Sequence, residues 1–559
     1  MAEPATEMMA ESESGAMAFA DYWKPPTDFY GQPVKGGTLR INYEDPLEHA
    51  NAWGAGSGVT DRYRMPTGAT LVMENPYDAG APLLPELAQS WDIHDNLDGV
   101  DFHFREGTTW HNGDVFTCED ARFSFETMRT GEGITASYMK SRLANVTALS
   151  CPDDMTLTMN FSGPTGIPLL PLSNRRAQIF NKAWFVEGGE DVMFQDVSVG
   201  LGPFMWRDGQ SVGIDTQYFD RNPNYYIPEL PYVDELVING ILDESTQQAT
   251  QLAHQTDWHW VRNWGQYQSY VDHEQIMTVI RATRGNFRLW INPRNAPFDN
   301  AKVRQAVIMS IDRNAAILVL QDGHGAAGGF GYAPGSPWEL SQAELCSVPG
   351  WCVSEDMEAT RAEAKAILEA EDFDFEQTYS FTVESDAQVQ ARATFLQEQL
   401  RLVGIQTDFD LVETIAYREQ EQSGTWGAFK PGNSTVTADD PNAGVAAFLR
   451  CDSAGNHWTP NGPCDQSIVD LLDQAQTELD QAKRLELAHQ IELAAMKQYS
   501  SFPVYWEQEA VSFWPEVRGY SHFPAPNGSF LKFMHLWIDP AHKDDSGNAG
   551  QITGVPGGA

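Results

Sequence analysis

Between residues 37 and 540 the 559-residue chain contains no low-complexity linker and no repeat of fixed period. A chain of this length ordinarily forms roughly three or four domains. Without linkers, these domains cannot follow one another as separate modules. We therefore expect domains that are woven together by strands, with the chain crossing between them.

A strand, a helix and a second strand are predicted in succession in the second half of the chain. Residues 379–383 and 405–411 have strand character, and residues 391–403 have helical spacing that stops at Gly404, which suits a left-handed cap. This order indicates a parallel α/β unit. Apolar residues at helical spacing across residues 468–495 predict one or two long helices.

The first half of the chain adds strands of a smaller sheet. These are predicted at residues 101–105 and 155–159, and residues 36–41 predict a short strand that opens the ordered fold. The predicted fold class is therefore α/β with mixed sheets. The polar composition of the two ends predicts a flexible tether at residues 1–36 and a flexible tail at residues 541–559.

The charge of the chain limits its partners. Lys plus Arg is 36 and Asp plus Glu is 78, which gives a formal net charge of −42. A nucleic-acid-binding protein needs a basic face, and no Lys/Arg-rich run is present, so nucleic acid and anionic membrane surfaces are excluded as partners. The acidity is interpreted either as a means of solubility or adaptation to a salty habitat, or as a means of steering cationic ligands.

No apolar run approaches the roughly 20 residues that a transmembrane helix requires. The first stretch, MAEPATEMMAESESGAMAFA, is acidic and lacks the basic and apolar regions of a signal peptide. The protein is therefore either cytoplasmic or an exported protein whose leader has been removed.

Cysteine usage favours export. The six cysteines form three pairs that are local in sequence: Cys118 with Cys151, Cys346 with Cys352, and Cys451 with Cys464. None has the CxxC spacing of a zinc or redox site, and an even set of this kind suits disulfides in an oxidising compartment. Six cysteines allow 15 pairings, so the connectivity stays open, as does the alternative of reduced, buried cysteines.

Tryptophan is concentrated in one short stretch, which includes Trp258, Trp260, Arg262 and Trp264 and is followed by Tyr267. One interpretation is an aromatic wall that stacks on a ligand, with Arg262 pairing with a ligand carboxylate. The alternative is that the tryptophans are core residues on one face of a strand or helix.

Motifs of other functions are missing from the sequence. The histidines are scattered, and no close His/Cys set has ligand spacing, so no metal site is predicted. The Gly-rich run at residues 323–335 lacks P-loop form, and neither GxSxG nor HExxH occurs. We therefore predict no cofactor and no enzymatic activity.

The segment from Pro85 to Glu126 contains short motifs in a fixed order. They are Leu87-Ala88, Ser90-Trp91, Phe104-Arg105 with Gly107, Trp110-His111-Asn112-Gly113, and Phe116-Thr117 through Asp120. This series resembles the signature of the family 5 bacterial extracellular solute-binding proteins, the oligopeptide-, dipeptide- and nickel-type receptors of ABC importers. Cys118 departs from the usual alanine of the family, which fits an additional disulfide.

Further segments resemble the same family, in the same order, over about residues 37–540. They are Gly200–Phe204, Arg221–Tyr226 with Leu230–Asp234, Pro297–Ala306 with Ile311–Arg313, Asp480–Arg484, and Phe502–Tyr505. The motif residues are expected to be scaffold. His111-Asn112-Gly113 would form a turn, and Asp312-Arg313 would end a helix and pair locally.

The resemblance implies a bilobed periplasmic-binding-protein fold of type II, cluster C, with ligand held between the lobes. Lobe one would comprise residues 37–60, 185–285 and 500–540, with an extra subdomain at residues 61–184. Lobe two would comprise residues 286–499.

The function implied is that of a periplasmic, monomeric receptor that binds a small solute and delivers it to the membrane permease of an ABC importer. The solute would be a peptide or an amino-acid derivative. An oligosaccharide or glycoside receptor of the same fold is the alternative, since carbohydrate sites also use indole stacking. A secreted hydrolase is the third possibility.

Peptide-binding relatives present an aspartate to the amino terminus of the peptide, and Asp439 matches that residue. Two neighbours depart from the pattern, because Asp440 replaces an aromatic residue and Val436 stands where a Trp is usual. The alternative role is an Asp that caps a turn before Pro441. Further candidates for the ligand site are Trp426, His457 and Trp458, and, after the first strand, Tyr43, Asp45 and Trp53.

Overall fold

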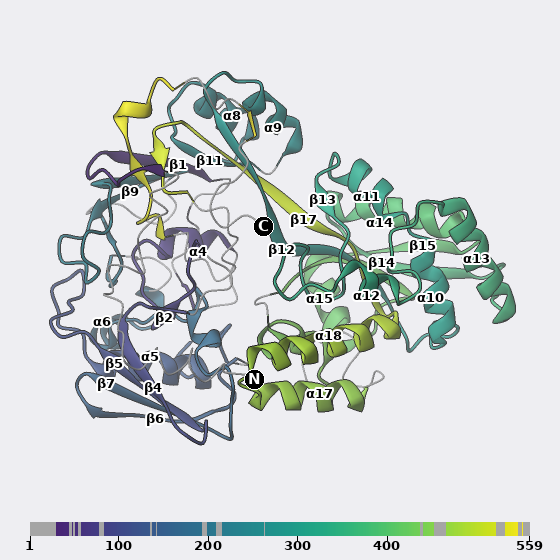
Figure 1. Ribbon diagram of the computed structural model, residues 1–559, viewed down its shortest axis with the longest axis horizontal. Helices are drawn as coiled ribbons and strands as arrows, with labels where there is room; N and C mark the ends of the chain where they lie inside the picture. Colours follow the sequence, from purple (N-terminus) through teal and green to yellow (C-terminus); the bar gives the residue numbers. More distant parts are fainter. Residues whose placement is uncertain are drawn as a thin grey trace, which may run out of the picture. The chain divides into compact units, whose positions relative to one another are not determined.

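The computed structural model describes residues 30–43, 47, 51–53, 58–77, 83–134, 137–140, 142–192, 198–207, 215–261, 263–436, 440–451, 465–520, 532–545 and 550–551. The chain forms two compact units (Figure 1). Unit 1 comprises Met1–Arg281 and Glu509–Gly558, and unit 2 comprises Ala282–Gln508. Unit 1 is therefore built from two separate parts of the chain.

The main sheet of unit 1 has the strand order β17-β11-β1-β10-β9-β8. Its strands are β1 (Thr38–Tyr43), β8 (Phe204–Trp206), β9 (Thr216–Arg221), β10 (Glu235–Gly240), β11 (Trp258–Val261) and the end of β17 (Ser501–Phe513). β1 is parallel to β10 and β11, and β9 and β17 are antiparallel to their neighbours. Leu39 and Ile41 of β1 are fully buried in the core, so the opening strand predicted at residues 36–41 is confirmed from Thr38 onward.

A second, four-stranded sheet of unit 1 has the order β4-β5-β7-β6, and all its pairs are antiparallel. Its strands are β4 (Ala88–Ile93), β5 (Gly99–Phe104), β6 (Val146–Asp153) and β7 (Thr156–Phe161). The strands predicted at residues 101–105 and 155–159 are confirmed as β5 and β7, which are direct neighbours in this sheet. Helix α5 (Cys118–Thr130) packs on β6 and β7 and buries Phe125 and Met128 in the same core.

The remaining elements of unit 1 are short. They are α4 (Gly58–Arg64), β2 (Val72–Met73), β3 (Leu84–Pro85), η2 (Leu170–Ser173), α6 (Lys182–Gly188), α8 (Glu244–Leu252), α9 (Trp264–Val271), β18 (Val517–Arg518), β19 (Trp537–Ile538), η5 (Pro540–His542) and β20 (Gly550–Gln551).

Unit 2 contains the predicted strand–helix–strand segment, and the prediction is confirmed. Strands β14 (Thr378–Glu384) and β15 (Gln406–Val412) are parallel and are joined by α14 (Ala387–Arg401). Gly404 after the helix has φ +92°, the left-handed conformation predicted for it. β16 (Phe429–Thr435) follows β14 in the sheet and is antiparallel to β12 (Met277–Ile291), where the chain enters this unit.

The other elements of unit 2 are mostly helices. They are α10 (Ala301–Met309), α11 (Arg313–Leu320), β13 (Gly325–Ala326), α12 (Gln342–Cys346), α13 (Met357–Ala370), α15 (Thr414–Ser423), η3 (Pro441–Val445), α16 (Ala446–Leu449), α17 (Gln466–Thr477) and α18 (Gln481–Gln498). The long helices predicted over residues 468–495 are therefore α17 and α18. The chain leaves unit 2 within β17.

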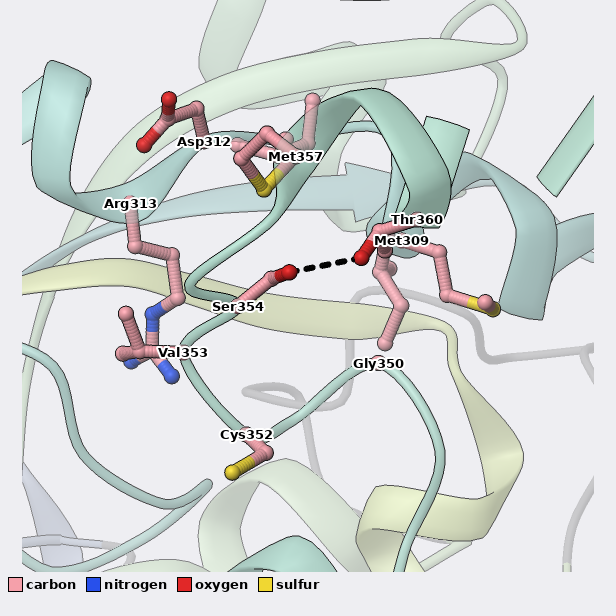
Figure 2. Close-up of a pocket in the computed structure, with 11 residues that line it drawn as sticks. Met309, Asp312, Arg313, Gly350, Cys352, Val353, Ser354, Met357 and Thr360 are labelled. Atoms are coloured by element: carbon pink, nitrogen blue, oxygen red, sulfur yellow. Dashed lines mark hydrogen bonds between the residues drawn. The ribbon is translucent and has the colours of Figure 1, made fainter. Parts of the chain in front are cut away.

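The Asp312-Arg313 pair departs from its prediction. The two residues, whose side chains are drawn in Figure 2, begin α11 instead of ending a helix. Asp312 accepts a hydrogen bond from the backbone N–H of Ala315 at 2.9 Å. Arg313 is buried and donates to the carbonyl oxygens of Val504, Trp351 and Gly328. A guanidinium has five N–H donors, so one arginine can satisfy several backbone carbonyl groups. A local ion pair with Asp312 would leave those carbonyl oxygens without a donor.

Order at the two ends of the chain extends further than predicted. Tyr30, within the predicted tether, is buried, and its hydroxyl donates to the carbonyl oxygen of Tyr520 at 2.6 Å. Within the predicted tail, β20 pairs with Met277 and Thr278 of β12. In both places a segment of polar composition is tied to the rest of the fold, by the Tyr30 side chain at one end and by strand pairing at the other.

Two of the three predicted disulfides are confirmed. Cys118 is bonded to Cys151 and Cys346 to Cys352. Cys451 is also disulfide-bonded, and Cys464, its predicted partner, lies outside the described residues. Within the described ranges, no helix combines the length and the apolar character needed to cross a membrane.

Candidate functional site

Three of the predicted aromatic residues meet at the carboxyl end of β1 and on β11 of unit 1. Trp258 and Trp260 are two residues apart on a strand, so both point to the same face of the sheet. Their ring centroids are 6.5 Å apart, and the ring of Tyr43 lies 6.3 Å from Trp258 and 6.4 Å from Trp260. The short strand thus turns a local sequence pattern into an aromatic cluster.

Two arginines pack against this cluster. The guanidinium of Arg62 lies 4.8 Å from the ring centre of Trp260 and 4.9 Å from that of Tyr43, and the guanidinium of Arg281 lies 5.1 Å from Trp260. Arg281 is buried and forms an ion pair with Glu509. Burial works against its charged form, but the Glu509 carboxylate holds the pKa of Arg281 above its ordinary value. Trp260 therefore contacts two guanidinium groups, which restrict the position of its ring.

Next to the cluster lies a small hollow that is partly open to solvent. It is lined by Pro76, Tyr77, Trp258, Gly519, Tyr520, Phe533, His535 and Leu536. Of these lining residues, only Trp258 was a predicted site residue.

The titratable residues of the hollow are held in their neutral forms. Burial raises the pKa of Tyr520 to about 12 and also raises the pKa of Tyr77. Burial, together with the nearby Lys532 ammonium, lowers the pKa of His535 to about 3. At neutral pH the walls are therefore aromatic and uncharged, which suits an apolar or aromatic group of a ligand.

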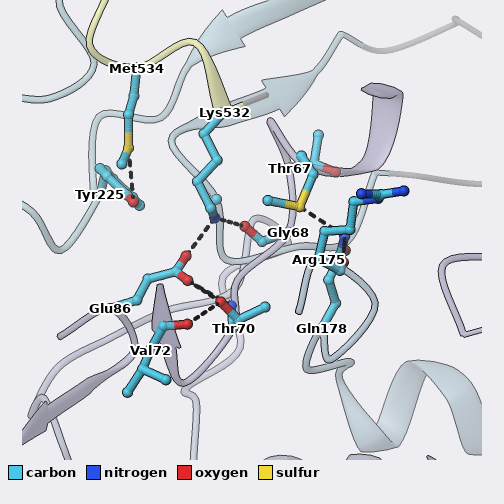
Figure 3. A network of polar contacts seen from close by, with 12 residues as sticks. Thr67, Gly68, Thr70, Val72, Glu86, Arg175, Gln178, Tyr225, Lys532 and Met534 are labelled. Carbon is cyan, nitrogen blue, oxygen red and sulfur yellow. Dashed lines mark hydrogen bonds and ion pairs between the residues drawn. The ribbon is translucent and has the colours of Figure 1, made fainter. Parts of the chain in front are cut away.

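A buried polar network fixes the segment that carries Phe533 and His535 (Figure 3). The ammonium of Lys532 lies 2.5 Å from a carboxylate oxygen of Glu86, and both side chains are fully buried. Lys532 also donates to the carbonyl oxygen of Gly68 at 2.6 Å, and Glu86 accepts hydrogen bonds from the backbone and hydroxyl of Thr70. The pair thus attaches one wall of the hollow to the interior of unit 1.

Other predicted site residues are placed elsewhere in unit 1. Trp264 and Tyr267 lie on α9 with their ring centroids 5.4 Å apart, and they pack in a separate cluster with Trp514. Trp53 is fully buried, 4.6 Å from the ring of Phe180, in the core that also contains the four-stranded sheet. The predicted wall of three tryptophans is therefore not one continuous surface.

In unit 2, Trp426 is buried beside Trp290. The ammonium of Lys430 lies 5.8 Å from the ring centre of Trp426 and 4.2 Å from that of Trp290, and it pairs with Glu421. The aromatic rings here enclose a cation supplied by the protein itself.

Several predicted site residues lie outside the described part of the chain. They are Arg262, Asp439 and Trp458, together with the secondary candidates Asp45 and His457.

Asp440, the residue that breaks the expected aromatic pattern, has a clear structural role. One carboxylate oxygen accepts hydrogen bonds from the backbone N–H groups of Asn442 and Ala443 at the start of η3, at 2.8 and 3.0 Å. The other oxygen pairs with Arg484, and both side chains are almost fully buried. Capping before Pro441, which was weighed for Asp439, is performed by Asp440.

Sequence reasoning missed Tyr77, Tyr520, Phe533 and His535. In the described part of the chain these last three residues lie outside the helices and strands, so no periodic pattern marks them. The one local signal is Gly519, which has φ +82°, a backbone conformation that favours glycine. A Cβ at this position would overlap the carbonyl oxygen of His535, so the glycine lets two lining segments approach each other.

Comparison with known proteins gives one family. The model for "Bacterial extracellular solute-binding proteins, family 5 Middle" matches residues 83–456. The dipeptide-binding protein DppE of Bacillus subtilis is 21% identical over 477 residues, which are 79% of this chain and 82% of that protein.

Solved structures agree with the fold. The periplasmic binding protein DppA of Helicobacter pylori in complex with the peptide STSA has a TM-score of 0.74 at 19% identity, covering 90% of this chain and 98% of that one. AgaA from A. tumefaciens R10 in complex with agropinic acid has a TM-score of 0.73 at 20% identity, covering 91% of this chain and 100% of that one. The predicted fold class, an α/β periplasmic-binding-protein fold with mixed sheets, is confirmed.

Proposed function

Because this chain belongs to the bacterial extracellular solute-binding proteins of family 5, we propose that it is the solute receptor of a bacterial ABC importer. Members of this family are binding proteins. The ligand proposed is a peptide or an amino-acid derivative, which the receptor captures outside the cytoplasm and passes to a membrane permease. Capture of this kind requires differential affinity between conformations and no change in the ligand's covalent bonds.

The observation that carries the ligand class is the neutral aromatic hollow of unit 1. It is walled by Trp258, Tyr520 and Phe533, whose aromatic surfaces suit contact with an apolar or aromatic group of a ligand. Because His535 and Tyr520 are both neutral at physiological pH, no charged wall has to be desolvated when such a group enters.

A saccharide ligand finds less support. It was inferred from the tryptophans at positions 258, 260 and 264 acting together, and Trp264 packs in a different cluster from the other two. Of the relatives named above, DppE is a dipeptide-binding protein, DppA has a bound peptide and AgaA has bound agropinic acid.

The location and partner follow from the same proposal. The two disulfides fit an oxidising compartment outside the cytoplasmic membrane. The permease is the proposed protein partner. Asp439 and Arg262 remain predictions for the residues that pair with the amino and carboxylate ends of the ligand.

The proposal is tested by titrating the purified full-length chain with peptide libraries and with oligosaccharides in a thermal-shift assay, followed by calorimetry on each hit. A specific ligand raises the unfolding midpoint by mass action. We expect peptide or amino-acid-derived hits that are recovered unchanged after incubation. Binding of saccharides alone, or turnover of a hit, would contradict the proposal.

Variants locate the ligand. Tyr77→Ala removes a half-buried aromatic ring from the wall of the hollow, and Trp258→Phe replaces an indole of the wall with a smaller ring. Each substitution is expected to weaken ligand binding about tenfold or more, which corresponds to roughly 1.4 kcal/mol. The matched control is Trp264→Ala, a tryptophan of the same stretch that lies on α9 and does not line the hollow. Equal affinity in all three folded variants would remove the hollow from the ligand site.

A further inference from the structure

Three side chains that bind metals in many proteins meet in unit 1. His254 follows α8, Asp257 immediately precedes β11, and Glu516 lies in the turn between β17 and β18. Each offers one ligand atom, and the three atoms lie within 4.8 Å of one another. None of these residues lines the aromatic hollow. The group could not be predicted from local sequence patterns, because Glu516 lies far along the chain from the other two residues.

The distances suit a small divalent ion. The Nε2 atom of His254 lies 2.7 Å from Oε1 of Glu516 and 4.0 Å from Oδ1 of Asp257. A four-coordinate zinc with bonds of about 2.0–2.2 Å separates neighbouring ligand atoms by roughly 3.3 Å. The two separations from Nε2 of His254 lie on either side of that value, and all three ligand atoms lie within 4.8 Å of one another.

The carboxylates of the group are buried and only partly satisfied. The side chains of Asp257 and Glu516 are 7% and 6% exposed. Asp257 accepts hydrogen bonds from the backbone and guanidinium of Arg40. By contrast, Oε2 of Glu516 is buried and has no hydrogen-bond partner among the described residues. A buried carboxylate oxygen without a partner costs free energy, and a cation bound to Glu516 would lower that cost by neutralising the charge of the carboxylate.

The histidine is held in place by its surroundings. Its ring stacks on the indole of Trp514, with centroids 3.9 Å apart and an angle of 15° between the planes. The same tryptophan donates its backbone N–H to the carbonyl of Asp257 and its indole N–H to the carbonyl of Gln251. The backbone of His254 is left-handed, with φ 54°. Trp514 thus links the histidine and the aspartate before any ion binds, which reduces the ordering required on binding.

We propose that His254, Asp257 and Glu516 form a binding site for a divalent transition-metal ion of the zinc type. One imidazole nitrogen and two carboxylate oxygens make up the donor set, and water would complete the coordination. The nitrogen donor favours zinc and its neighbours over magnesium and calcium, which take oxygen ligands. Two carboxylates also balance the charge of a divalent ion. The site is independent of the solute proposed above.

The test uses tag-free, full-length protein treated with a chelator and then dialysed. Calorimetric titration with Zn²⁺ at pH 7.5 is expected to show one equivalent bound, and Co²⁺ is expected to give visible absorption bands of a low-coordinate site. The unfolding midpoint should rise with Zn²⁺ concentration. Failure of the wild-type protein to bind one equivalent of either ion, or equally tight binding of Mg²⁺ or Ca²⁺, overturns the proposal.

Two variants assign the site. His254→Asn keeps a residue type that tolerates the left-handed backbone, and Glu516→Gln keeps the shape of the side chain. Both are expected to weaken Zn²⁺ binding at least tenfold. The matched control is His103→Asn, which removes a histidine paired with Asp92 at 2.8 Å on the exposed surface of unit 1. Circular dichroism and the metal-free midpoint establish that each variant is folded. Wild-type affinity in folded His254→Asn and Glu516→Gln proteins overturns the assignment.

Discussion

His111 and Arg313 belong to motifs that resemble those of the family, and both pack against backbone groups, His111 half-buried and Arg313 buried. Nε2 of His111 lies 3.1 Å from the carbonyl oxygen of Gly202, and the backbone N–H of His111 donates to Gly200. A Cβ at either glycine would overlap the backbone of Thr67 or Pro66, so these glycines allow a close approach of two chain segments. The motif residues thus hold chain segments together, as predicted for the scaffold.

The burial of His111 predicts an acid-sensitive contribution to stability. Burial lowers the pKa of His111 to about 4, whereas the unfolded side chain titrates near 6.5. Between these values the unfolded chain binds the proton and the folded protein does not, so the contribution is complete above about pH 6.5 and is lost as the pH falls toward 4. The loss amounts to about 3 kcal/mol at most.

Urea unfolding at pH 7.0 and 4.5 measures this effect, with His111→Gln as the comparison. Other groups also titrate in this range, so the difference between wild type and variant isolates the histidine. The variant is expected to lose less stability than the wild type on acidification. An identical loss in both proteins would show that His111 is not responsible.

The positions of individual residues also explain which site residues could be predicted from the sequence. Trp258 and Trp260 have the two-residue spacing of a strand, and with Tyr43 they do form one cluster. Trp264 lies beyond the strand, at the start of α9, and the short stretch gave no sign of that change of element. Phe533 and His535 could not be found, because only tertiary contacts bring them to Trp258.

Among the helices and strands, those that are determined by interactions between residues close in sequence could be predicted from the sequence pattern. The β14–α14–β15 segment and its Gly404 cap were predicted because period, order and cap agree. The two longest strands, β12 and β17, were not predicted as continuous elements. Both are buried over most of their length on both faces, so neither shows the alternation that marks a half-exposed strand.

The two described disulfides are expected to contribute unequally to stability. Cys118–Cys151 closes a loop with a sequence separation of 33, and Cys346–Cys352 closes one of 6. Loop-closure entropy gives about 4 kcal/mol for the first and about 2 kcal/mol for the second. Replacing each pair by alanine and measuring urea unfolding tests the difference, each double variant serving as the control for the other. An equal or larger loss for the short loop would contradict the expectation.

For the molecule as a whole, the burial of several Lys and Arg side chains leaves an excess of negative charge at the surface. The chain carries 36 Lys and Arg against 78 Asp and Glu, and several of those cations are buried. Lys532, Lys430, Arg281 and Arg484 are each paired in the interior with a carboxylate. The remaining surface is therefore dominated by carboxylates, whose mutual repulsion opposes the compact state.

Salt is therefore expected to stabilise the protein. Raising NaCl from about 0.02 to 0.5 M shortens the Debye length severalfold and should raise the unfolding midpoint at pH 7.5 by a few degrees. The control is the same titration near pH 4.5, the isoelectric point, where the effect should be much smaller. A midpoint at pH 7.5 that stays constant or falls with salt would exclude repulsion as a major term.

The discontinuous build of unit 1 sets an order of events during synthesis. Strand β11 gains its neighbour β17 only when residues 510–513 have left the ribosome, and the hollow needs Phe533 and His535 as well. Unit 2, by contrast, is one uninterrupted stretch that ends at Gln508. The nascent polypeptide can therefore complete its second half first, and the half that contains the aromatic hollow stays unfinished until translation is almost over.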